Sequence, residues 1–345
     1  MFFADCYQLL FGIEEKAIAV AYSQLGRSRS IIILALNRVC FLKESSIKIS
    51  NKMSIKTDKV QVGKFQWFYR HTTVGFSEEI LPQETRSEIE REGTPMLFLH
   101  GLPSHSYTWE QLMFLLAEED IPSIAPDWIG SGFSDKPDKR NFAYTPEAFL
   151  AGLGEFIAAI KLEKFYLVVQ GFLASVGVQY ALQNPEQIAG LIILNTPITS
   201  GAKLPWSMKQ MTLPVMGDMM TQDPLLVDRH LEKGSGFVIE DKNLDILRKP
   251  FLQSSDVGRA LMTTLKKLQL DTVTPTIEAG LKDWSQPTLI IWGSADPWLD
   301  VEAVKKLAAA NSEITLIELP TAKHYPQEHW TSDIAREIVQ FFLSN

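Results

Sequence analysis

The chain has 345 residues, of which 46% are hydrophobic and 21% charged, and this composition excludes disordered, collagen-like and coiled-coil proteins. Its net charge of −8, without a long run of lysine or arginine, argues against nucleic-acid partners and anionic membranes. The two cysteines, Cys6 and Cys40, cannot form a disulfide framework, and no Cys/His cluster has zinc spacing, so we expect no metal site.

Residues 1–52 differ from the rest of the chain in charge. Seven basic and four acidic residues give this segment a charge of +3, which leaves −11 on the remaining residues. Its most apolar run, Ile31–Leu42, is shorter than the ~20 apolar residues of a bilayer span, so we expect no stable membrane insertion. We predict a weakly ordered extension, or a start assigned too early with Met53 as the initiator.

The same segment bears on the location of the protein. Secretion is not expected, because the apolar run follows a stretch of mixed polarity and lacks a small-residue cleavage site. The acidic residues Glu14, Glu15 and Glu44 argue against an organellar transit peptide, which is poor in acids. We therefore expect a cytoplasmic protein, with a plastid as the alternative if the source is eukaryotic.

From Met53 onward the sequence alternates between predicted strands and predicted helices. Residues 60–70 alternate polar and apolar side chains, as in a half-buried antiparallel pair at a sheet edge. Six short apolar runs bounded by turn residues are predicted strands: Met96–Leu99, Ser123–Pro126, Phe165–Val169, Leu191–Leu194, Leu289–Trp292 and Ile314–Ile317. Five segments have helical periodicity: Trp109–Glu119, Pro146–Ile160, Phe172–Leu182, Val301–Ala310 and Ser332–Leu343. Continuous apolar strands that alternate with helices indicate a mostly parallel sheet covered on both faces.

One interval interrupts this alternation. Between Asn195 and Pro287 no strand-like run occurs, and the helical stretches are rich in methionine. We predict that residues 198–280 form a helical cap and that residues 53–197 and 281–345 form the core. The methionines are Met208, Met211, Met216, Met219 and Met220. We expect them to pack the cap, to line an apolar pocket, or both.

Three loops follow predicted strands at their carboxyl ends, where open α/β sheets place their ligand sites. The first reads HGLP, residues 100–103, directly after a predicted strand. The second reads DWIGSGFSDKP, residues 127–137, after the next strand. The third reads GSADPW, residues 293–298, and His324 follows 28 residues after Asp296.

Together these motifs closely resemble those of the α/β-hydrolase superfamily, in its haloalkane dehalogenase and epoxide hydrolase branch. The resemblance covers about residues 55–345 and extends to cyanobacterial and plastid members with a similar V-V-Q-G turn. It implies an α/β fold with a mostly parallel eight-stranded sheet flanked by helices and a helical cap inserted after the sixth strand. The Gly130-Ser131-Gly132 turn is not a phosphate loop, since no Gly-Lys-Ser/Thr follows it.

The resemblance implies a catalytic base at His324 and an orienting acid at Asp296. The chemistry agrees, because a carboxylate on Nδ1–H fixes the tautomer that an imidazole base needs. The chain order of nucleophile, acid and histidine is that of α/β-hydrolases. By the same resemblance, the backbone N–H groups of Leu102 and Phe172 would form an oxyanion hole.

The nucleophile of this family is missing from its expected place. The turn after the predicted strand Phe165–Val169 reads Q-G-F, so Gly171 occupies the nucleophile position. Ser175 lies a full turn further along the predicted helix, ~6 Å away, and we expect it to be a small packing residue. A covalent hydrolase that takes its nucleophile from Ser104 or Ser106 is a minor alternative.

The electrophilic helpers of both specialised activities are also absent. Residues 198–280 contain no tyrosine, whereas epoxide hydrolases of this branch use two cap tyrosines. Phe172 and Leu102 stand where dehalogenases have a Trp and, in many members, an Asn that holds the halide. Nucleophile and helpers are thus lost together.

Two functions remain open. In the first, the His324–Asp296 dyad deprotonates water or the substrate itself in an apolar, capped pocket, and no covalent intermediate forms. In the second, the chain is a catalytically inactive pseudo-hydrolase that binds a small ligand or a protein. For the pocket we predict a small hydrophobic molecule in contact with His100, Pro103, Trp128, Trp206 and Trp298. No cofactor is implied, because dinucleotide and phosphate motifs are lacking, and the sequence sets no oligomeric state.

Overall fold

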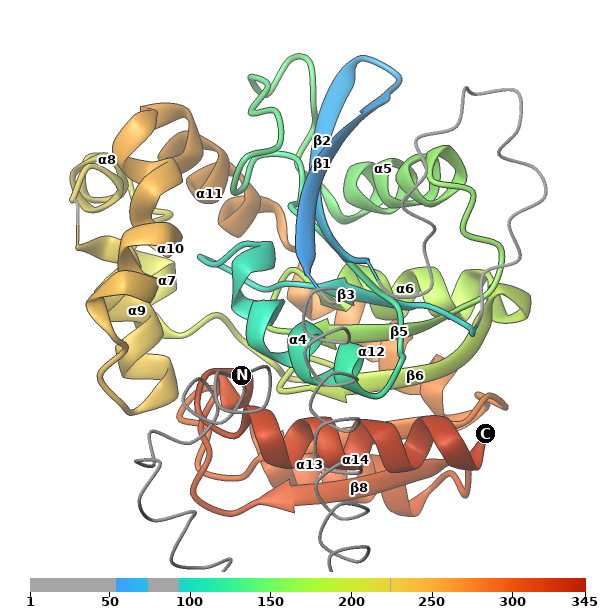
Figure 1. The fold of residues 1–345 in the computed structure, drawn as a ribbon. Helices are drawn as coiled ribbons and strands as arrows, with labels where there is room; N and C mark the ends of the chain where they lie inside the picture. Colours follow the sequence, from blue (N-terminus) through green and yellow to red (C-terminus); the bar gives the residue numbers. More distant parts are fainter. Residues whose placement is uncertain (1–53, 74–92, 224) are drawn as a thin grey trace, which may run out of the picture. The chain divides into compact units, whose positions relative to one another are not determined.

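A computed structural model describes residues 54–73, 93–223 and 225–345 of the chain (Figure 1). The predictions for residues 1–52, including a start at Met53, lie outside the described residues. None of the helices in the described ranges has the length and apolar character needed to cross a bilayer. The same ranges contain no cluster of three metal-ligating side chains.

The described residues form one eight-stranded sheet in the order β1-β2-β4-β3-β5-β6-β7-β8. Its strands are β1 (Ile55–Val62), β2 (Phe65–Thr72), β3 (Met96–Leu99), β4 (Ser123–Pro126), β5 (Phe165–Gln170), β6 (Ile188–Leu194), β7 (Thr288–Gly293) and β8 (Ile314–Leu319). The hairpin of β1 and β2 and the pairing of β2 with β4 are antiparallel, and the other pairs are parallel. This confirms the predicted α/β architecture, because the central strands are buried along their whole length, as a sheet covered on both faces requires.

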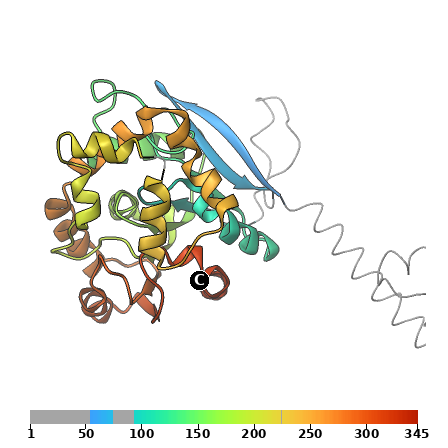
Figure 2. The same ribbon diagram turned by 90° about the vertical axis from the view of Figure 1, so that its left-hand side faces the viewer.

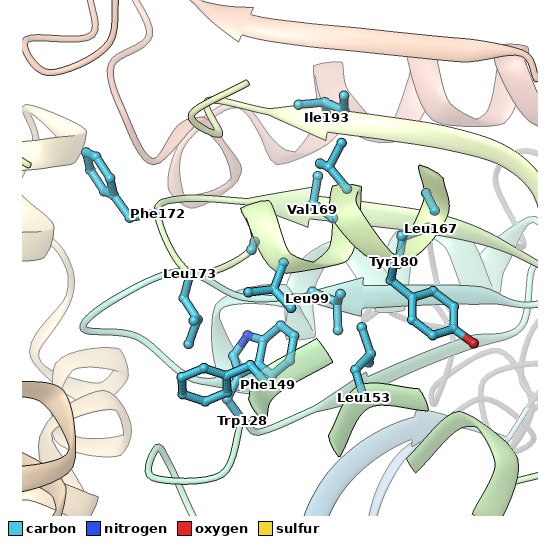
Figure 3. Packing of buried hydrophobic residues seen from close by; sticks show 14 of the residues in the cluster. Leu99, Trp128, Phe149, Leu153, Leu167, Val169, Phe172, Leu173, Tyr180 and Ile193 are labelled. Carbon is cyan, nitrogen blue, oxygen red and sulfur yellow. The ribbon is translucent and has the colours of Figure 1, made fainter. Parts of the chain in front are cut away.

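Helices cover both faces of the sheet, since successive side chains of a strand point to opposite sides. The flanking helices are α4 (Glu110–Glu118), α5 (Pro146–Ala159), α6 (Ser175–Gln183), α13 (Val301–Ala309) and α14 (Thr331–Ser344). Leu99 and Val169 pack with α5, α6 and α13, whereas Phe98 and Val168 pack with α4 and α14. Figure 3 shows the first of these clusters around Leu99.

The segment between β6 and β7 contains six helices within the described residues. They are α7 (Trp206–Gln210), α8 (Met216–Thr221), α9 (Leu226–Ser235), α10 (Asp241–Gln253), α11 (Ser255–Lys267) and α12 (Leu270–Lys282). The helices α7 to α11 gather beside one end of the sheet (Figures 1 and 2). Helix α12 packs on α6 instead, and its Ile277 and Leu281 join the core cluster of the sheet. The predicted cap boundary at residue 280 therefore falls inside a helix, and the division at 198–280 stays a prediction.

The five methionines singled out in this segment are placed differently. Met208 and Met211 are buried and belong to the main core cluster, and Met220 is half-buried and packs against that cluster. Met216 and Met219 of α8 are exposed. The packing interpretation therefore describes the first three and does not extend to the last two.

Candidate active site

The dyad predicted from the sequence is assembled at the carboxyl edge of the sheet. Asp296 follows β7, and His324 follows β8, so the parallel strands bring residues 28 positions apart to the same edge. His324 Nδ1–H donates a hydrogen bond to Asp296 Oδ2 at 2.8 Å, and both side chains are fully buried. This bond fixes the tautomer and leaves the lone pair of Nε2 as a proton acceptor.

Three further hydrogen bonds hold the Asp296 carboxylate. The Asn195 amide donates to Oδ2 at 2.8 Å, and the backbone N–H of Trp298 donates to Oδ1 at 2.8 Å. A longer bond to Oδ1, at 3.4 Å, comes from Leu299 N. Asn195 also bridges to β7, because it accepts from Gly293 N at 2.8 Å and donates to Gly293 O at 3.1 Å.

Sequence reasoning missed the contribution of Asn195. The available signal was its position, since it is the first polar residue after the apolar strand β6 and so lies at the same sheet edge as the dyad. The Asn195 amide holds the Asp296 carboxylate, and this carboxylate orients His324. Asn195 is therefore a positioning residue for the dyad.

Aromatic rings surround the imidazole of His324. The ring centroids of Trp298, Tyr325 and Phe172 lie 4.6, 4.9 and 5.2 Å from that of the histidine. Within the described part of the chain, Nε2 is buried and has no hydrogen-bond partner. A buried acceptor without a donor costs about 1–3 kcal/mol, so Nε2 is an atom prepared to take a proton or a hydrogen bond.

The turn after β5 brings two backbones into contact. Gly171 has φ +84°, and a Cβ placed on it would lie 2.8 Å from Gly101 Cα. A Cβ on Gly101 would in turn lie 2.8 Å from the carbonyl oxygen of Gln170. Only glycine fits at both positions without a shift of the main chain. That Gly171 is the site of a lost nucleophile stays a prediction.

Helix α6 begins at Ser175, three residues later than predicted from the periodicity. The N–H groups of Val176 and Gly177 bond three residues back, to Leu173 and Ala174, so a tight turn separates Gly171 from the helix. Ser175 is buried, and its hydroxyl donates to Phe172 O at 2.9 Å.

The other serines considered as nucleophiles differ in their hydrogen bonds. The Ser104 hydroxyl donates to His105 O at 3.4 Å. The backbone N–H of Ser106 donates to Asp127 Oδ1 at 2.7 Å, whereas its buried hydroxyl has no hydrogen-bond partner among the described residues. Among the described residues, none of the hydroxyls of Ser104, Ser106 and Ser175 is hydrogen-bonded to His324.

The loops that carry Leu102 and Phe172 are tied to the histidine loop. Tyr325 donates its hydroxyl to Leu102 O at 2.8 Å, and Gln170 donates its amide to His324 O at 2.7 Å. These bonds place both backbone segments beside the dyad. Their role as an oxyanion hole stays a prediction.

Two residues predicted to line a pocket are built into the core. His100 Nδ1–H donates to Gly101 O at 2.8 Å, and its Nε2 accepts from Trp128 N at 3.2 Å, so both nitrogens are used. Burial lowers the pKa of His100 to about 4, and the ring is therefore neutral. Trp128 donates its indole N–H to His100 O and packs on Phe149, within the core seen in Figure 3. Their assignment to a substrate pocket stays a prediction.

The remaining predicted pocket residues are placed differently. Pro103 is buried beside this loop, and Trp298 contacts the imidazole directly. Trp206 on α7 is 65% exposed, which is the position of a surface residue rather than that of a wall of an enclosed pocket. Phe172 also points away from the core around Leu99 (Figure 3).

Helix α9 contacts the histidine loop. His324 N donates to Gly234 O at 2.8 Å. A Cβ on Gly234 would collide with the rings of Tyr325 and Trp298, so the missing side chain allows this close approach.

Comparison with known proteins gives a consistent picture. Residues 94–329 match the profile of a family described as the alpha/beta hydrolase fold. Haloalkane dehalogenase 2 of Mycobacterium tuberculosis is 24% identical over 262 residues, which cover 73% of this chain and 89% of that protein. A cis-3-alkyl-4-alkyloxetan-2-one decarboxylase of Shewanella oneidensis is 36% identical over 108 residues, which cover 31% of this chain and 34% of that protein.

Solved structures show the same fold. The crystal structure of haloalkane dehalogenase DbeA from Bradyrhizobium elkani matches with a TM-score of 0.72 at 21% identity, over 84% of this chain and 98% of that one. An ancestral haloalkane dehalogenase matches with a TM-score of 0.71 at 23% identity, over 83% and 98%.

Proposed function

The chain belongs to the α/β-hydrolase fold family, and we propose that His324 acts in it as a general base on water, without a covalent enzyme intermediate. The observation that carries the proposal is the buried hydrogen bond between His324 Nδ1 and Asp296 Oδ2 at 2.8 Å, together with a His324 Nε2 that has no hydrogen-bond partner among the described residues. A general base of this kind contributes roughly 10²–10⁴-fold to a rate.

The reaction that fits this arrangement is hydrolysis of an activated carbonyl compound. Nε2 takes a proton from water while the water oxygen forms a bond to the carbonyl carbon. The backbone N–H groups of Leu102 and Phe172 stabilise the oxyanion. When the C–O bond to the leaving group breaks, the leaving oxygen takes the proton from the imidazolium. The products are an acid and an alcohol, or a hydroxy acid from a cyclic ester.

The substrate class follows from the missing side chain at Gly171 and from the walls of the site. Without covalent catalysis the barrier is not divided into two smaller ones, which favours a strained or otherwise reactive electrophile. The rings of Phe172 and Trp298 beside the base favour a small hydrophobic molecule. The similar decarboxylase is named for an oxetan-2-one, a four-membered lactone, which supports placing small alkyl lactones first.

Access to the base involves the cap in this proposal. Nε2 lies under aromatic side chains, and α9 is bonded to the backbone of His324 through Gly234. Entry of water and substrate therefore requires Trp298, Phe172 or α9 to shift, as in enzymes whose lids open and close.

The test is turnover of a panel of four- to six-membered alkyl lactones, short-chain esters and epoxides. We expect hydrolysis of at least one lactone or ester by the wild type. His324→Gln should lower kcat/KM by roughly 10²–10⁴-fold. His71→Gln, on strand β2 between β1 and β4, is the matched control and should retain wild-type turnover. Equal activity of His324→Gln and the control would overturn the proposal.

A second candidate, the pseudo-hydrolase, is favoured by the burial of Nε2 and by the glycine at position 171. It requires no turnover of any compound in the panel. It also requires that ligands found by thermal-shift screening bind the wild type and His324→Gln with equal affinity. The two candidates thus differ in whether His324 affects a rate.

A further inference from the structure

A cavity lies beside the loop that follows the dyad. Its volume is about 770 Å³, and its walls come from four places in the chain, one of them Ser54 and Ile55. Tyr107 and Glu110 lie on the 3₁₀ turn Ser106–Trp109 and the start of α4, Val238 and Lys242 lie just before and at the start of α10, and Glu328 lies in the short 3₁₀ helix η4 (Pro326–Glu328). Neither His324 nor Asp296 lines it, so the cavity is separate from the dyad.

The wall formed by η4 presents a buried acceptor. Gln327 donates its amide to Thr108 Oγ1 at 3.0 Å, and Thr108 donates its hydroxyl to Glu328. Gln327 is 2% exposed, and its Oε1 has no hydrogen-bond partner among the described residues. Buried side-chain acceptors are normally satisfied, so an orphan at a cavity wall points to a donor supplied by a ligand.

The charges around the cavity are mostly negative. Glu110 binds Arg70 at 2.7 Å and Glu240 binds Lys242 at 2.6 Å, so these two carboxylates have cationic partners. In the part of the chain that the structure describes, no Lys or Arg pairs with Glu328. The cavity therefore has one unpaired carboxylate beside the orphan acceptor.

The mouth of the cavity is apolar. Val238 is 83% exposed and Phe114 is 44% exposed, and both line it. Exposed apolar side chains next to a polar floor are typical of a site for a ligand with a polar end and an apolar end.

We propose that this cavity binds a small alkylammonium ion. Its N–H groups donate to Gln327 Oε1 and to the Glu328 carboxylate, and its alkyl chain packs on Phe114 and Val238. Anions are disfavoured by the Glu328 carboxylate, and a neutral alcohol lacks the positive charge that pairs with an ionised carboxylate. Binding in this cavity does not require turnover at His324. The binding proposal and the proposed hydrolysis are therefore tested independently.

Proton linkage supports the choice of a cation. Burial raises the pKa of Glu328 to about 7, since no cation offsets the loss of water. Of the other titratable groups at the cavity, Lys242 has a raised pKa and stays charged, Tyr107 has a raised pKa and stays neutral, and His329 has a lowered pKa. Glu328 is thus the group whose charge changes near neutral pH, and a bound cation favours its ionised form.

The experiment is isothermal titration of the full chain with butylammonium chloride, with butanol and butyrate as comparison ligands. We expect saturable binding of butylammonium alone, tightening about fourfold between pH 6.5 and 8 as Glu328 ionises. Glu328→Gln should weaken binding by roughly 10- to 100-fold and remove the pH dependence. Glu118→Gln, an exposed carboxylate on the same helix as Glu110, controls for net charge and should bind as the wild type does.

A second pair of variants avoids any effect on folding. Val238 is almost fully exposed, so Val238→Lys and Val238→Glu leave the interior unchanged. The lysine should weaken butylammonium binding several-fold at low salt, and the glutamate should strengthen it. Equal affinities for these two variants would overturn the proposal, as would equal affinities for Glu328→Gln and Glu118→Gln or equal binding of butanol.

Discussion

Two stretches of one loop differ in how they use an unpaired polar atom. At His324, Nε2 has no hydrogen-bond partner in the described ranges and is surrounded by aromatic rings, and Nδ1 is held by a carboxylate. At Gln327, three residues later, Oε1 also has no partner in these ranges, and it lies at the wall of a cavity beside the carboxylate of Glu328. The first arrangement prepares a base for proton transfer, and the second prepares acceptors for a charged ligand. Burial alone therefore does not distinguish a reactive group from a binding group, whereas the neighbouring charges do.

The largest expected effect is the loss of turnover on substitution of His324, which should leave ligand binding at Gln327 unchanged. His324→Gln should reduce lactone or ester turnover by roughly 10²–10⁴-fold, because it removes the general base of the proposed reaction. The same variant should bind butylammonium with wild-type affinity. Turnover is measured by pH-stat and binding by calorimetry on the same sample. Loss of both turnover and butylammonium binding in this variant would show that the two stretches form one site, which contradicts the distinction between them.

The next effect concerns the close approach at Gly171. Gly171→Ala should lower the free energy of unfolding by about 1–3 kcal/mol more than Gly201→Ala, measured by urea denaturation. The control is closely matched, since Gly201 has φ +86° against +84° at Gly171, and a Cβ on Gly201 meets nothing within 4 Å. Equal destabilisation would mean that the contact with Gly101 Cα adds nothing to the strain of a positive φ.

The close contact at Gly171 also affects a variant that places a carboxylate at this position. Gly171→Asp carries the same Cβ contact, so we expect destabilisation together with any gain of haloalkane or epoxide hydrolysis. Product formation is measured by gas chromatography beside an unfolding curve. A stable Gly171→Asp protein without activity would argue that this turn is not the nucleophile position.

A smaller effect is expected at Asn195, whose amide holds Asp296 at 2.8 Å. Asn195→Ala should lower kcat about tenfold with little change in KM, because the dyad is misplaced while the binding walls remain. Asn184→Ala, whose amide bonds to the helix carbonyl of Tyr180, removes an equivalent group away from the site and should leave kcat unchanged. A change confined to KM would assign Asn195 to binding instead.

The smallest effect lies in the pH dependence of stability. The raised pKa of Glu328, about 7, means that the folded chain holds a proton that the unfolded chain releases above about 4.5. This group therefore makes the free energy of unfolding fall as pH rises from about 4.5 to 7. Glu328→Gln should remove that slope. His100 and His230, each with a pKa lowered to about 4, act in the opposite sense, so the difference between variant and wild type is the quantity to measure.

Much of the fold could be predicted because its signals are local. The buried strands Met96–Leu99 and Ser123–Pro126 have the bounds that their apolar runs indicate. His324 and Asp296 were predicted from the resemblance to a family, and their positions after two predicted strands agree with it, because parallel strands bring their ends together. Local sequence patterns do not show which side chains, far apart in the sequence, contact one another in the fold.

The surroundings that the sequence does not reveal depend on such partners. Trp128 was predicted to line a pocket, and the structure packs its ring against Trp67 and Phe149. Trp206 lies on the short helix α7, where it is exposed while Met208 is buried. Asn195 and Gln327 show no motif, and their roles appear only when Asp296 and Thr108 lie beside them.

The most direct test is the intact mass of His324→Gln during incubation with the best substrate of the panel, beside the wild type. If His324 is a base on water and no covalent intermediate forms, the variant keeps its unmodified mass while turnover is nearly lost. A covalent mechanism with a carboxylate nucleophile, which attacks without the help of a base, stalls after the first step when the base for hydrolysis is removed, and the protein then gains the mass of the substrate or its acyl part. Such an adduct, or turnover equal to the wild type, would contradict the proposal; an unmodified and nearly inactive variant beside an active wild type is the expected result.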